Sequence, residues 1–506
     1  MADHRLVVKN TLFLYLRMFI TIVVTLYTTR VVLNVLGVVD YGIYNVVGGF
    51  VSMLTFLTAT MSNASTRFFA IELGGKHERQ LKVTFKVTMT VYLFLIIGIL
   101  ILAETIGLWF VRNKLTIPSS QLYAAIIVYQ FSVLGLILNI IRIPFNAAII
   151  AHEKMDFYAY LSIVEAVLKL LIVYLLIISP WNKLAFYSVL LCCVVGIVTL
   201  VYYIYCRKHY SECRFGLDFS KSKINEILRF SGWNLFSNFG DVMMDQGMNI
   251  LLNIFFGPAI NAARALAYNV KSVLLSFVGN FQTASTPQIT KHYAANEINE
   301  MNQLVVQTSK LSYMLMLILV IPSYFCIDRI LHLWLIDVPA YTNIFTKLLL
   351  VEVLFMAMGG TLNNAIQAKG HIQPLIIGLS IVKIINFILA FVGLKICIFP
   401  PEFVFWVCIL NSSACMILKI YFYKKEFKDV AKNVIKEIII KEVYTTVVSL
   451  SIVGCMAFLF YKPSDMISMI IMSLVSFIIT AVCILEIGLT KQERSMAFNL
   501  IFRFFR

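Results

Sequence analysis

Charged residues are scarce in this chain. They make up 13% of its 506 residues, whereas a typical soluble domain is about a quarter charged. Hydrophobic residues make up 60%. Many apolar runs reach the roughly 20 residues that a helix needs to cross a bilayer. The composition therefore excludes a soluble globular protein and predicts an all-α integral membrane protein.

Several signatures of chemistry are also missing. The chain has no glycine-rich phosphate loop, which excludes a built-in ATPase, and no Ser, Cys or His constellation typical of a hydrolase. Its ten cysteines form no pattern and suit small buried apolar positions. Its histidines lack metal-ligand spacing. We therefore predict that the protein is not an enzyme and has neither a metal nor another cofactor.

The apolar runs predict about fourteen membrane spans. They lie near residues 12–36, 43–66, 85–110, 122–148, 158–179, 184–205, 231–256, 262–286, 304–327, 343–366, 374–396, 402–422, 444–461 and 466–488. The net charge of +16 comes from Lys and Arg clustered in every second connection, such as 207–223 and 424–436. By the positive-inside rule these connections and both termini are cytoplasmic, so the charge does not indicate nucleic-acid binding.

Parts of the sequence occur twice in the same direction. Two matches are 220 residues apart, Gly37 with Gly257 and Ala64-Ser65-Thr66 with Ala284-Ser285-Thr286. Two more are 218 residues apart, Asn146-Ala147 with Asn364-Ala365 and Leu161-Ser162-Ile163-Val164 with Leu379-Ser380-Ile381-Val382. A direct repeat in a membrane chain is typical of two similar bundles facing a central site, which favours transport.

The repeat also predicts the domain organisation. Spans 1–6 form an N-lobe over residues 1–220, and spans 7–12 form a C-lobe over 221–423. A basic amphipathic linker follows at 424–443, suited to an anionic membrane surface, and 444–506 holds spans 13 and 14 with a cytoplasmic tail. The fold class is therefore two parallel-repeat six-helix lobes plus two C-terminal helices.

Charged residues inside the spans are candidate site residues. Placing each charged side chain at mid-bilayer costs roughly 2.5–3.5 kcal/mol unless it is paired or in contact with water. Span seven has a polar face that includes Asn238, Asp241 and Asp245, and span eight carries Arg264, Tyr268, Lys271 and Gln282. Two interpretations remain open: these residues line a cavity, or Asp245 and Lys271 form a structural ion pair. Glu165 and Lys169 are one turn apart and are expected to neutralise each other.

The remaining candidates are mostly cationic. Arg17, Arg30 and Asn34 lie in span one, Arg142 in span four and Lys383 in span eleven. An interior rich in Arg and Lys suits an anion such as a diphosphate. If transport is coupled to H⁺ or Na⁺, the carboxylates to test are Asp241, Asp245 and Glu165, because a buried carboxylate can hold a proton or a cation.

The segment Leu36-Gly37-Val38-Val39-Asp40-Tyr41-Gly42-Ile43-Tyr44-Asn45-Val46-Val47-Gly48-Gly49, followed by Ala64-Ser65-Thr66-Arg67-Phe68, resembles the start of bacterial polysaccharide-transport flippases. These Wzx-like proteins belong to the MOP (multidrug/oligosaccharidyl-lipid/polysaccharide) exporter superfamily, whose fold is MATE-like. The resemblance implies flipping of undecaprenyl-diphosphate-linked oligosaccharide, such as an O-antigen unit of lipopolysaccharide, across the bacterial inner membrane by alternating access. It also implies membrane lipid and other polysaccharide-assembly membrane proteins as partners.

Three alternatives stay open. A cation-coupled multidrug exporter and a peptidoglycan-precursor flippase belong to the same superfamily. Multidrug exporters commonly carry an acidic residue in the first span, where this chain has Arg17 and Arg30. An integral-membrane glycosyltransferase is the alternative from another class.

Overall fold

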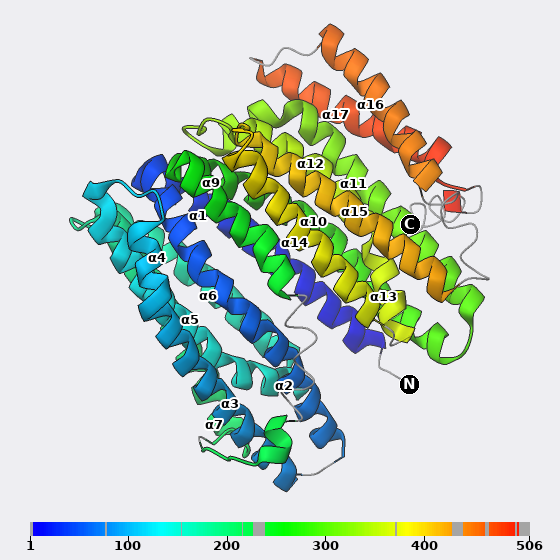
Figure 1. Ribbon diagram of the computed structural model, residues 1–506. Helices are drawn as coiled ribbons and strands as arrows, with labels where there is room; N and C mark the ends of the chain where they lie inside the picture. Colours follow the sequence, from blue (N-terminus) through cyan, green and yellow to red (C-terminus); the bar gives the residue numbers. More distant parts are fainter. Residues whose placement is uncertain are drawn as a thin grey trace. The chain divides into compact units, whose positions relative to one another are not determined.

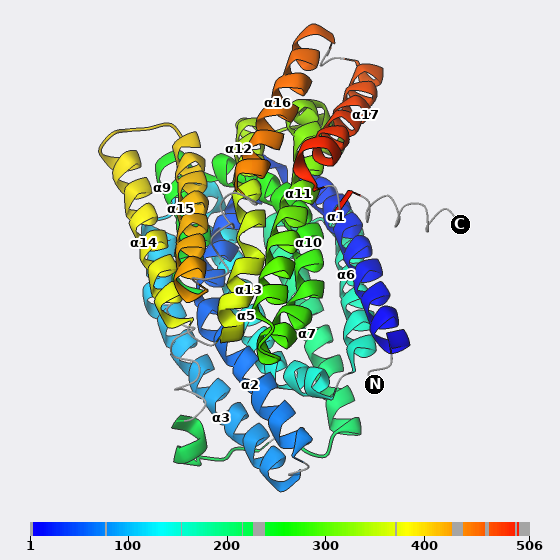
Figure 2. The same cartoon turned by 90° about the vertical axis from the view of Figure 1, so that its right-hand side faces the viewer.

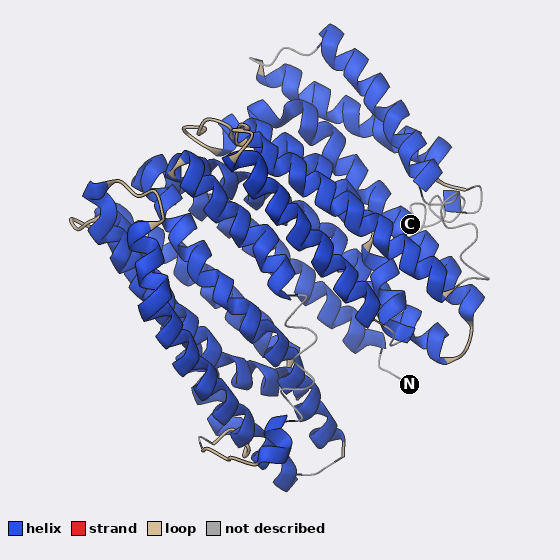
Figure 3. Ribbon diagram, viewed as in Figure 1, coloured by secondary structure: helices blue, strands red, loops and turns tan. Residues whose placement is uncertain are grey.

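The protein is described by a computed structural model over residues 4–75, 78–152, 154–214, 216–225, 238–369, 372–427, 439–460, 465–490 and 493–494. Within these ranges the side chains of 4–17, of 460 and of some residues within 57–74, 155–159 and 283–287 are not described. All regular structure in these ranges is helical (Figure 3). The predicted all-α class is confirmed. Arg17 lies in a helix, but its side chain is outside the described part.

Eleven helical segments in the described ranges are long and apolar enough to cross a membrane. They are Met18–Thr55, Glu78–Asn113, Ser119–Ala151, Tyr160–Ile178, Lys183–His209, Ile298–Trp334, Thr342–Lys369, Gln373–Lys395, Glu402–Glu426, Lys441–Leu459 and Met466–Gly488. The expected span 43–66 falls on the junction of the first two helices, and 262–286 falls within a long helix, Pro258–Ala294. The protein is thus a multi-pass membrane protein, as the apolar runs predict.

The chain divides into two compact units, and unit 1 comprises Met1–Ala265 and Lys383–Pro401. Figure 1 labels the helices of both units. The helices of unit 1 are α1 (His4–Ser52), α2 (Phe56–Gly74), α3 (Glu78–Leu102), α4 (Leu108–Asn113), α5 (Leu122–Ala151), α6 (Met155–Ile178), α7 (Lys183–His209) and α9 (Met248–Phe256). Short π-helical turns, Ala103–Gly107 and Met243–Gly247, precede α4 and α9. Helix α5 packs along α7 and α3, where Tyr129, Ile140 and Phe145 are fully buried.

Unit 2 comprises Leu266–Val382 and Glu402–Arg506. It holds most of α10 (Pro258–Ala294), then α11 (Ile298–Trp334), α12 (Thr342–Met358), α13 (Gly360–Lys369), the start of α14 (Gln373–Lys395), α15 (Glu402–Glu426), α16 (Lys441–Phe460) and α17 (Met466–Cys483). These units do not follow the repeat boundary at 220/221, so the two six-helix lobes stay a prediction. Residues 428–438 of the expected linker lie outside the described ranges.

The two C-terminal helices, α16 and α17, pack on α11 (Figure 2). An ion pair between the buried Lys310 of α11 and Glu493, which follows α17, adds a further contact between α11 and this C-terminal region. Burial by itself raises the pKa of Glu493, but hydrogen bonds from Lys310 and from the backbone and hydroxyl of Thr490 outweigh it and lower that pKa. The segment that ends in Glu493 is therefore held to α11 by charge as well as by apolar contact.

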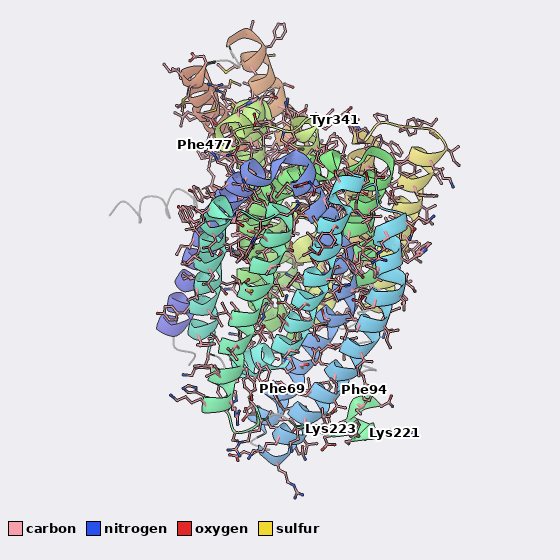
Figure 4. The ribbon with its side chains drawn as sticks, turned by 90° about the vertical axis from the view of Figure 1, so that its left-hand side faces the viewer. Phe69, Phe94, Lys221, Lys223, Tyr341 and Phe477 are labelled. Carbon is pink, nitrogen blue, oxygen red and sulfur yellow. The ribbon has the colours of Figure 1, made fainter. Side chains whose placement is uncertain are left out.

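The basic stretch after α7 is also anchored by an ion pair within its own unit. Lys223 donates to Glu72 Oε1 at 2.7 Å and to Thr84 Oγ1 at 2.8 Å. Figure 4 shows Lys223 beside Lys221 at one end of unit 1. One of the lysines that the positive-inside rule counts thus also has a structural role.

The repeat is visible in the backbone. Gly37 interrupts α1 with φ 79° and ψ 168°, and Gly257 separates α9 from α10 with φ 83° and ψ 179°. This region of backbone space is essentially restricted to glycine. The two glycines matched by sequence therefore make the same sharp helix-to-helix junction in both copies.

The segment that carries the family resemblance packs tightly within unit 1. A Cβ at Gly42 would stand 1.8 Å from the carbonyl oxygen of Pro258, so α1 and α10 approach backbone to backbone there. Nearby, Asn249 Nδ2 donates to the carbonyl oxygen of Asn45 at 3.2 Å. This part of the motif is explained by helix packing.

Candidate functional site

A polar cavity of about 230 Å³ lies within unit 1, between four helices that are candidate membrane spans. It is lined by Thr21, Val24, Thr25 and Thr28 of α1, Arg142 and Asn146 of α5, Leu161, Ser162, Glu165, Ala166 and Lys169 of α6, and Tyr202 of α7. We call it the first-copy pocket, because all of its residues belong to the first copy of the repeat.

The charges of the first-copy pocket meet at one carboxylate. Lys169 Nζ donates to Glu165 Oε1 at 2.8 Å, and Arg142 Nη1 contacts Glu165 Oε2 at 3.4 Å. The Arg142 guanidinium also lies 5.7 Å from the centre of the Tyr202 ring. The predicted Glu165–Lys169 pair is confirmed, and Arg142 joins it from another helix. With both cations charged, the pocket carries a net charge of about +1 around one carboxylate.

Hydroxyl and amide groups complete the pocket. Thr21, Thr25 and Thr28 recur at helical spacing on one face of α1, and the Thr28 hydroxyl donates to the Thr25 carbonyl oxygen at 3.0 Å. Within the described part of the chain, the buried Oδ1 of Asn146 has no hydrogen-bond partner. Sequence reasoning did not select these residues for the site, although the threonine spacing was a usable signal.

In the second copy, the predicted candidates Asp241 and Lys383 form an ion pair within unit 1. Lys383 Nζ lies 2.5 Å from Asp241 Oδ1. The lysine side chain is 12% exposed and the aspartate 60% exposed. Lys383 has no partner in its own helix, as expected, but it finds one in the segment before α9.

The neighbouring carboxylate, Asp245, lies in the π-helical turn before α9 and binds Arg264. Arg264 Nη2 lies 2.5 Å from Asp245 Oδ1 and donates to the Asp245 carbonyl oxygen at 2.8 Å. Arg264 is buried, whereas the aspartate side chain is 50% exposed. In both pairs the carboxylate is therefore the more exposed member, although the sequence predicts a cationic lining.

Lys271 has its partner within unit 2. Its Nζ donates to Glu352 Oε2 at 2.7 Å, and the Ser412 hydroxyl donates to Glu352 Oε1 at 3.0 Å. Lys271 also lies 4.9 Å from the centre of the Tyr268 ring. The Asp245–Lys271 pair considered from the sequence is wrong, because Arg264 and Glu352 are the respective partners.

The other candidates do not join the first-copy pocket. Gln282 Nε2 donates to the carbonyl oxygen of Ala357 at 2.8 Å. Arg30 and Asn34 are exposed on α1, and Asn238 is half-buried. Among the described residues, no three His, Cys, Asp or Glu side chains are placed to share a metal ion.

Many helical spans, a repeated helix junction and a charged pocket between spans are features expected of a membrane transporter. The profile of the family described as polysaccharide biosynthesis protein matches residues 7–293, and the chain belongs to this family. A second profile, MatE, matches residues 234–392. No curated protein matches the chain in sequence.

Solved structures show the same fold. The lipid II flippase MurJ in an inward closed conformation has a TM-score of 0.71 at 13% identity, covering 93% of this chain and 98% of that one. An inward-facing MATE multidrug transporter has a TM-score of 0.68 at 13% identity, covering 81% and 96%. The MATE multidrug transporter DinF-BH has a TM-score of 0.64 at 17% identity, covering 85% and 97%. The protein thus belongs to the polysaccharide biosynthesis protein family and has the fold of these MATE and MurJ structures.

Proposed function

We propose that this protein flips undecaprenyl-diphosphate-linked oligosaccharide from the inner to the outer leaflet of the bacterial cytoplasmic membrane, with both termini in the cytoplasm. The glycan would be a repeat unit for a surface polysaccharide such as O-antigen. Membership of the polysaccharide biosynthesis family supports this substrate class. The observation that carries the proposal is the first-copy pocket, which offers a polar, net positive environment between membrane spans.

The mechanism follows from charge. The polar head passes through the protein while the polyprenyl tail stays in lipid, which avoids exposing sugars and phosphates to hydrocarbon. An anionic head that moves outward gains roughly 2.3 kcal/mol per charge per 100 mV when the cell interior is negative. Transport of this substrate therefore does not strictly require a coupling ion.

The predicted cations keep their proposed role in holding the diphosphate. Arg264, Lys271 and Lys383 are each paired with a carboxylate, so the diphosphate would replace that carboxylate as the counterion. Such an exchange keeps each cation paired, but it leaves the buried Glu352 carboxylate without Lys271, so the Lys271 pair is the most costly of the three to open. Arg17, Arg30 and Arg142 would complete the anion-binding set.

A cation-coupled multidrug exporter is the second candidate. It is favoured by the MatE match over residues 234–392, which contains the half-exposed carboxylates Asp241 and Asp245. If H⁺ or Na⁺ is coupled to transport, these two aspartates and Glu165 are the groups we propose for it. Flipping of a peptidoglycan precursor is a third outcome, consistent with the fold shared with MurJ.

The test is reconstitution of the purified protein in lipid vesicles that contain a lipid-linked oligosaccharide, a peptidoglycan precursor or a cationic dye. We expect faster leaflet exchange of the oligosaccharide with its glycan unchanged. Exchange of only the precursor, export of only the dye, or a modified glycan would contradict the proposal. Arg142→Ala should slow exchange, whereas Lys347→Ala, which removes an ion-paired cation of similar exposure, should not.

A further inference from the structure

The first-copy pocket is too small for a lipid-linked oligosaccharide. Its volume of about 230 Å³ falls below the roughly 300–1,000 Å³ of pockets that enclose drug-sized ligands. Its occupant is therefore an ion or one small polar group. We propose that the pocket is a subsite for one neutral sugar ring of the transported glycan, an inference that rests on the proposed function.

The polar groups of the pocket would be satisfied by a ligand that both donates and accepts hydrogen bonds. Asn146 lines the pocket, and its amide group can both accept and donate hydrogen bonds. The Lys169 ammonium and the Arg142 guanidinium can only donate, so they need acceptors beyond the single carboxylate of Glu165. Sugar hydroxyl groups supply both functions from adjacent ring positions.

Ions satisfy only half of these requirements. An inorganic cation would be repelled by the net positive charge that Arg142 and Lys169 leave after pairing with Glu165. Chloride is not repelled, but it cannot donate a hydrogen bond to the threonine hydroxyl oxygens or to the Glu165 carboxylate of the lining. A neutral polyhydroxyl group avoids both conflicts, which favours it over an inorganic cation and over chloride.

The walls of the pocket suit a ring with both polar and apolar edges. The threonines of α1 bring hydroxyl groups, while Val24, Leu161 and Ala166 bring aliphatic surface. A pyranose ring has C–H groups that can cover such surface while its hydroxyls reach the polar groups. Leu161 and Ala166 are only 6% exposed, so this apolar wall is firmly packed.

The second copy of the repeat explains why the subsite is found in the first. Thr21 and Glu165 line the pocket, and their repeat counterparts are Asp241 and Lys383. These counterparts contact each other directly at 2.5 Å. The ion pair satisfies both side chains without a ligand, whereas in the first copy Glu165 is paired with Lys169 and Arg142, and Thr21 is left with a hydroxyl on the pocket wall.

The experiment is saturation-transfer NMR on the full-length protein in lipid nanodiscs. The probes are methyl glycosides of glucose, galactose and N-acetylglucosamine, each tested alone and against sodium chloride or sodium phosphate at matched ionic strength. At least one glycoside should receive saturation at its ring protons. Asn146→Leu and Thr25→Val should weaken its binding about tenfold, the effect of losing one buried hydrogen bond, and Thr25→Ser should restore it.

Asn364→Leu is the matched control, because Asn364 is the repeat counterpart of Asn146 and donates to Thr286 in unit 2. It should leave glycoside binding unchanged. No saturation of any glycoside, displacement of the glycoside by chloride or phosphate at low concentration, or equal losses in Asn146→Leu and Asn364→Leu would overturn the subsite. Vesicles separate the two proposals: oligosaccharide exchange without glycoside binding refutes the subsite alone, whereas no exchange by the wild-type protein refutes the proposed function.

Discussion

The two copies of the repeat share a backbone and differ in charge. Gly37 and Gly257 make the same junction, with φ near 80° in both copies. Where the first copy has Thr21 and Glu165 beside a cavity, the second has Asp241 and Lys383 in direct contact. The shared backbone gives the scaffold, and the charge difference marks where the copies take on separate roles.

The copies also differ in which charge is exposed. In the first copy, Lys169 is 44% exposed and Glu165 is 24% exposed, so a cation is the more accessible group. In the second copy, Asp241 is 60% exposed over a lysine at 12%. We therefore expect the first copy to contact the sugars of the substrate, whose hydroxyl oxygens accept hydrogen bonds from its cations, and the second to be the candidate for ion coupling.

The largest expected effect is at Gly42, whose counterpart in the second copy is Ala262. Gly42→Ala places a methyl group 1.8 Å from the carbonyl oxygen of Pro258, and we expect it to cost about 3 kcal/mol or more of stability. Ala262→Gly should cost only about 1 kcal/mol. Thermal unfolding in detergent measures both, and equal losses would contradict the packing described for this segment.

The second effect is at the ion pair of the second copy. Asp241→Asn leaves the largely buried Lys383 ammonium, 12% exposed, without its charged partner, so we expect a loss of about 2–3 kcal/mol. Lys383→Gln leaves Asp241 more than half exposed to its surroundings and should cost about 1 kcal/mol or less. The same unfolding measurement separates them, and a larger loss in Lys383→Gln would show that the lysine is not the buried member.

The third effect compares the helix junctions. Gly37→Ala and Gly257→Ala should each cost about 1–3 kcal/mol, because alanine strains this backbone region. The added methyl group meets no atom closer than 4.0 Å at either position, so strain is the main cause. If the two variants lose stability by amounts that differ by more than about 1 kcal/mol, the junctions are not structurally equivalent.

The smallest effect is within the first-copy pocket. Lys169→Ala removes a half-exposed partner of Glu165 and should cost less than about 1 kcal/mol. Arg142→Ala should cost somewhat more, because Arg142 also packs on Tyr202 and is less exposed. A double-mutant cycle with Glu165→Gln measures each coupling, and no coupling to Arg142 would remove it from the cluster.

The sequence predicts local features well. Apolar runs locate the helices, Gly37 and Gly257 mark the repeated junction, and the four-residue spacing identifies the Glu165–Lys169 pair. Contacts between helices that are far apart in the sequence cannot be predicted from these local patterns. Lys271 pairs with Glu352 across 81 residues, and nothing in either local pattern favours that partner over Asp245.

The first-copy pocket cannot be predicted from the sequence either, because it also depends on contacts between helices that are far apart in the chain. Its lining combines four helices, and Asn146 entered the sequence comparison only as a marker of the repeat. A threonine stripe on one helix face is compatible with close packing as well as with a polar site. Only the packing of α5, α6 and α7 against α1 decides between them.

The most direct test is oligosaccharide flipping by Asn146→Leu and Asn364→Leu in parallel. Both proteins would be reconstituted at equal density in vesicles with the same lipid-linked oligosaccharide, and leaflet exchange would be timed. Flipping should slow about tenfold in Asn146→Leu and stay at the wild-type rate in Asn364→Leu. Equal rates in the two variants, or slowing in Asn364→Leu alone, would contradict a substrate site in the first copy.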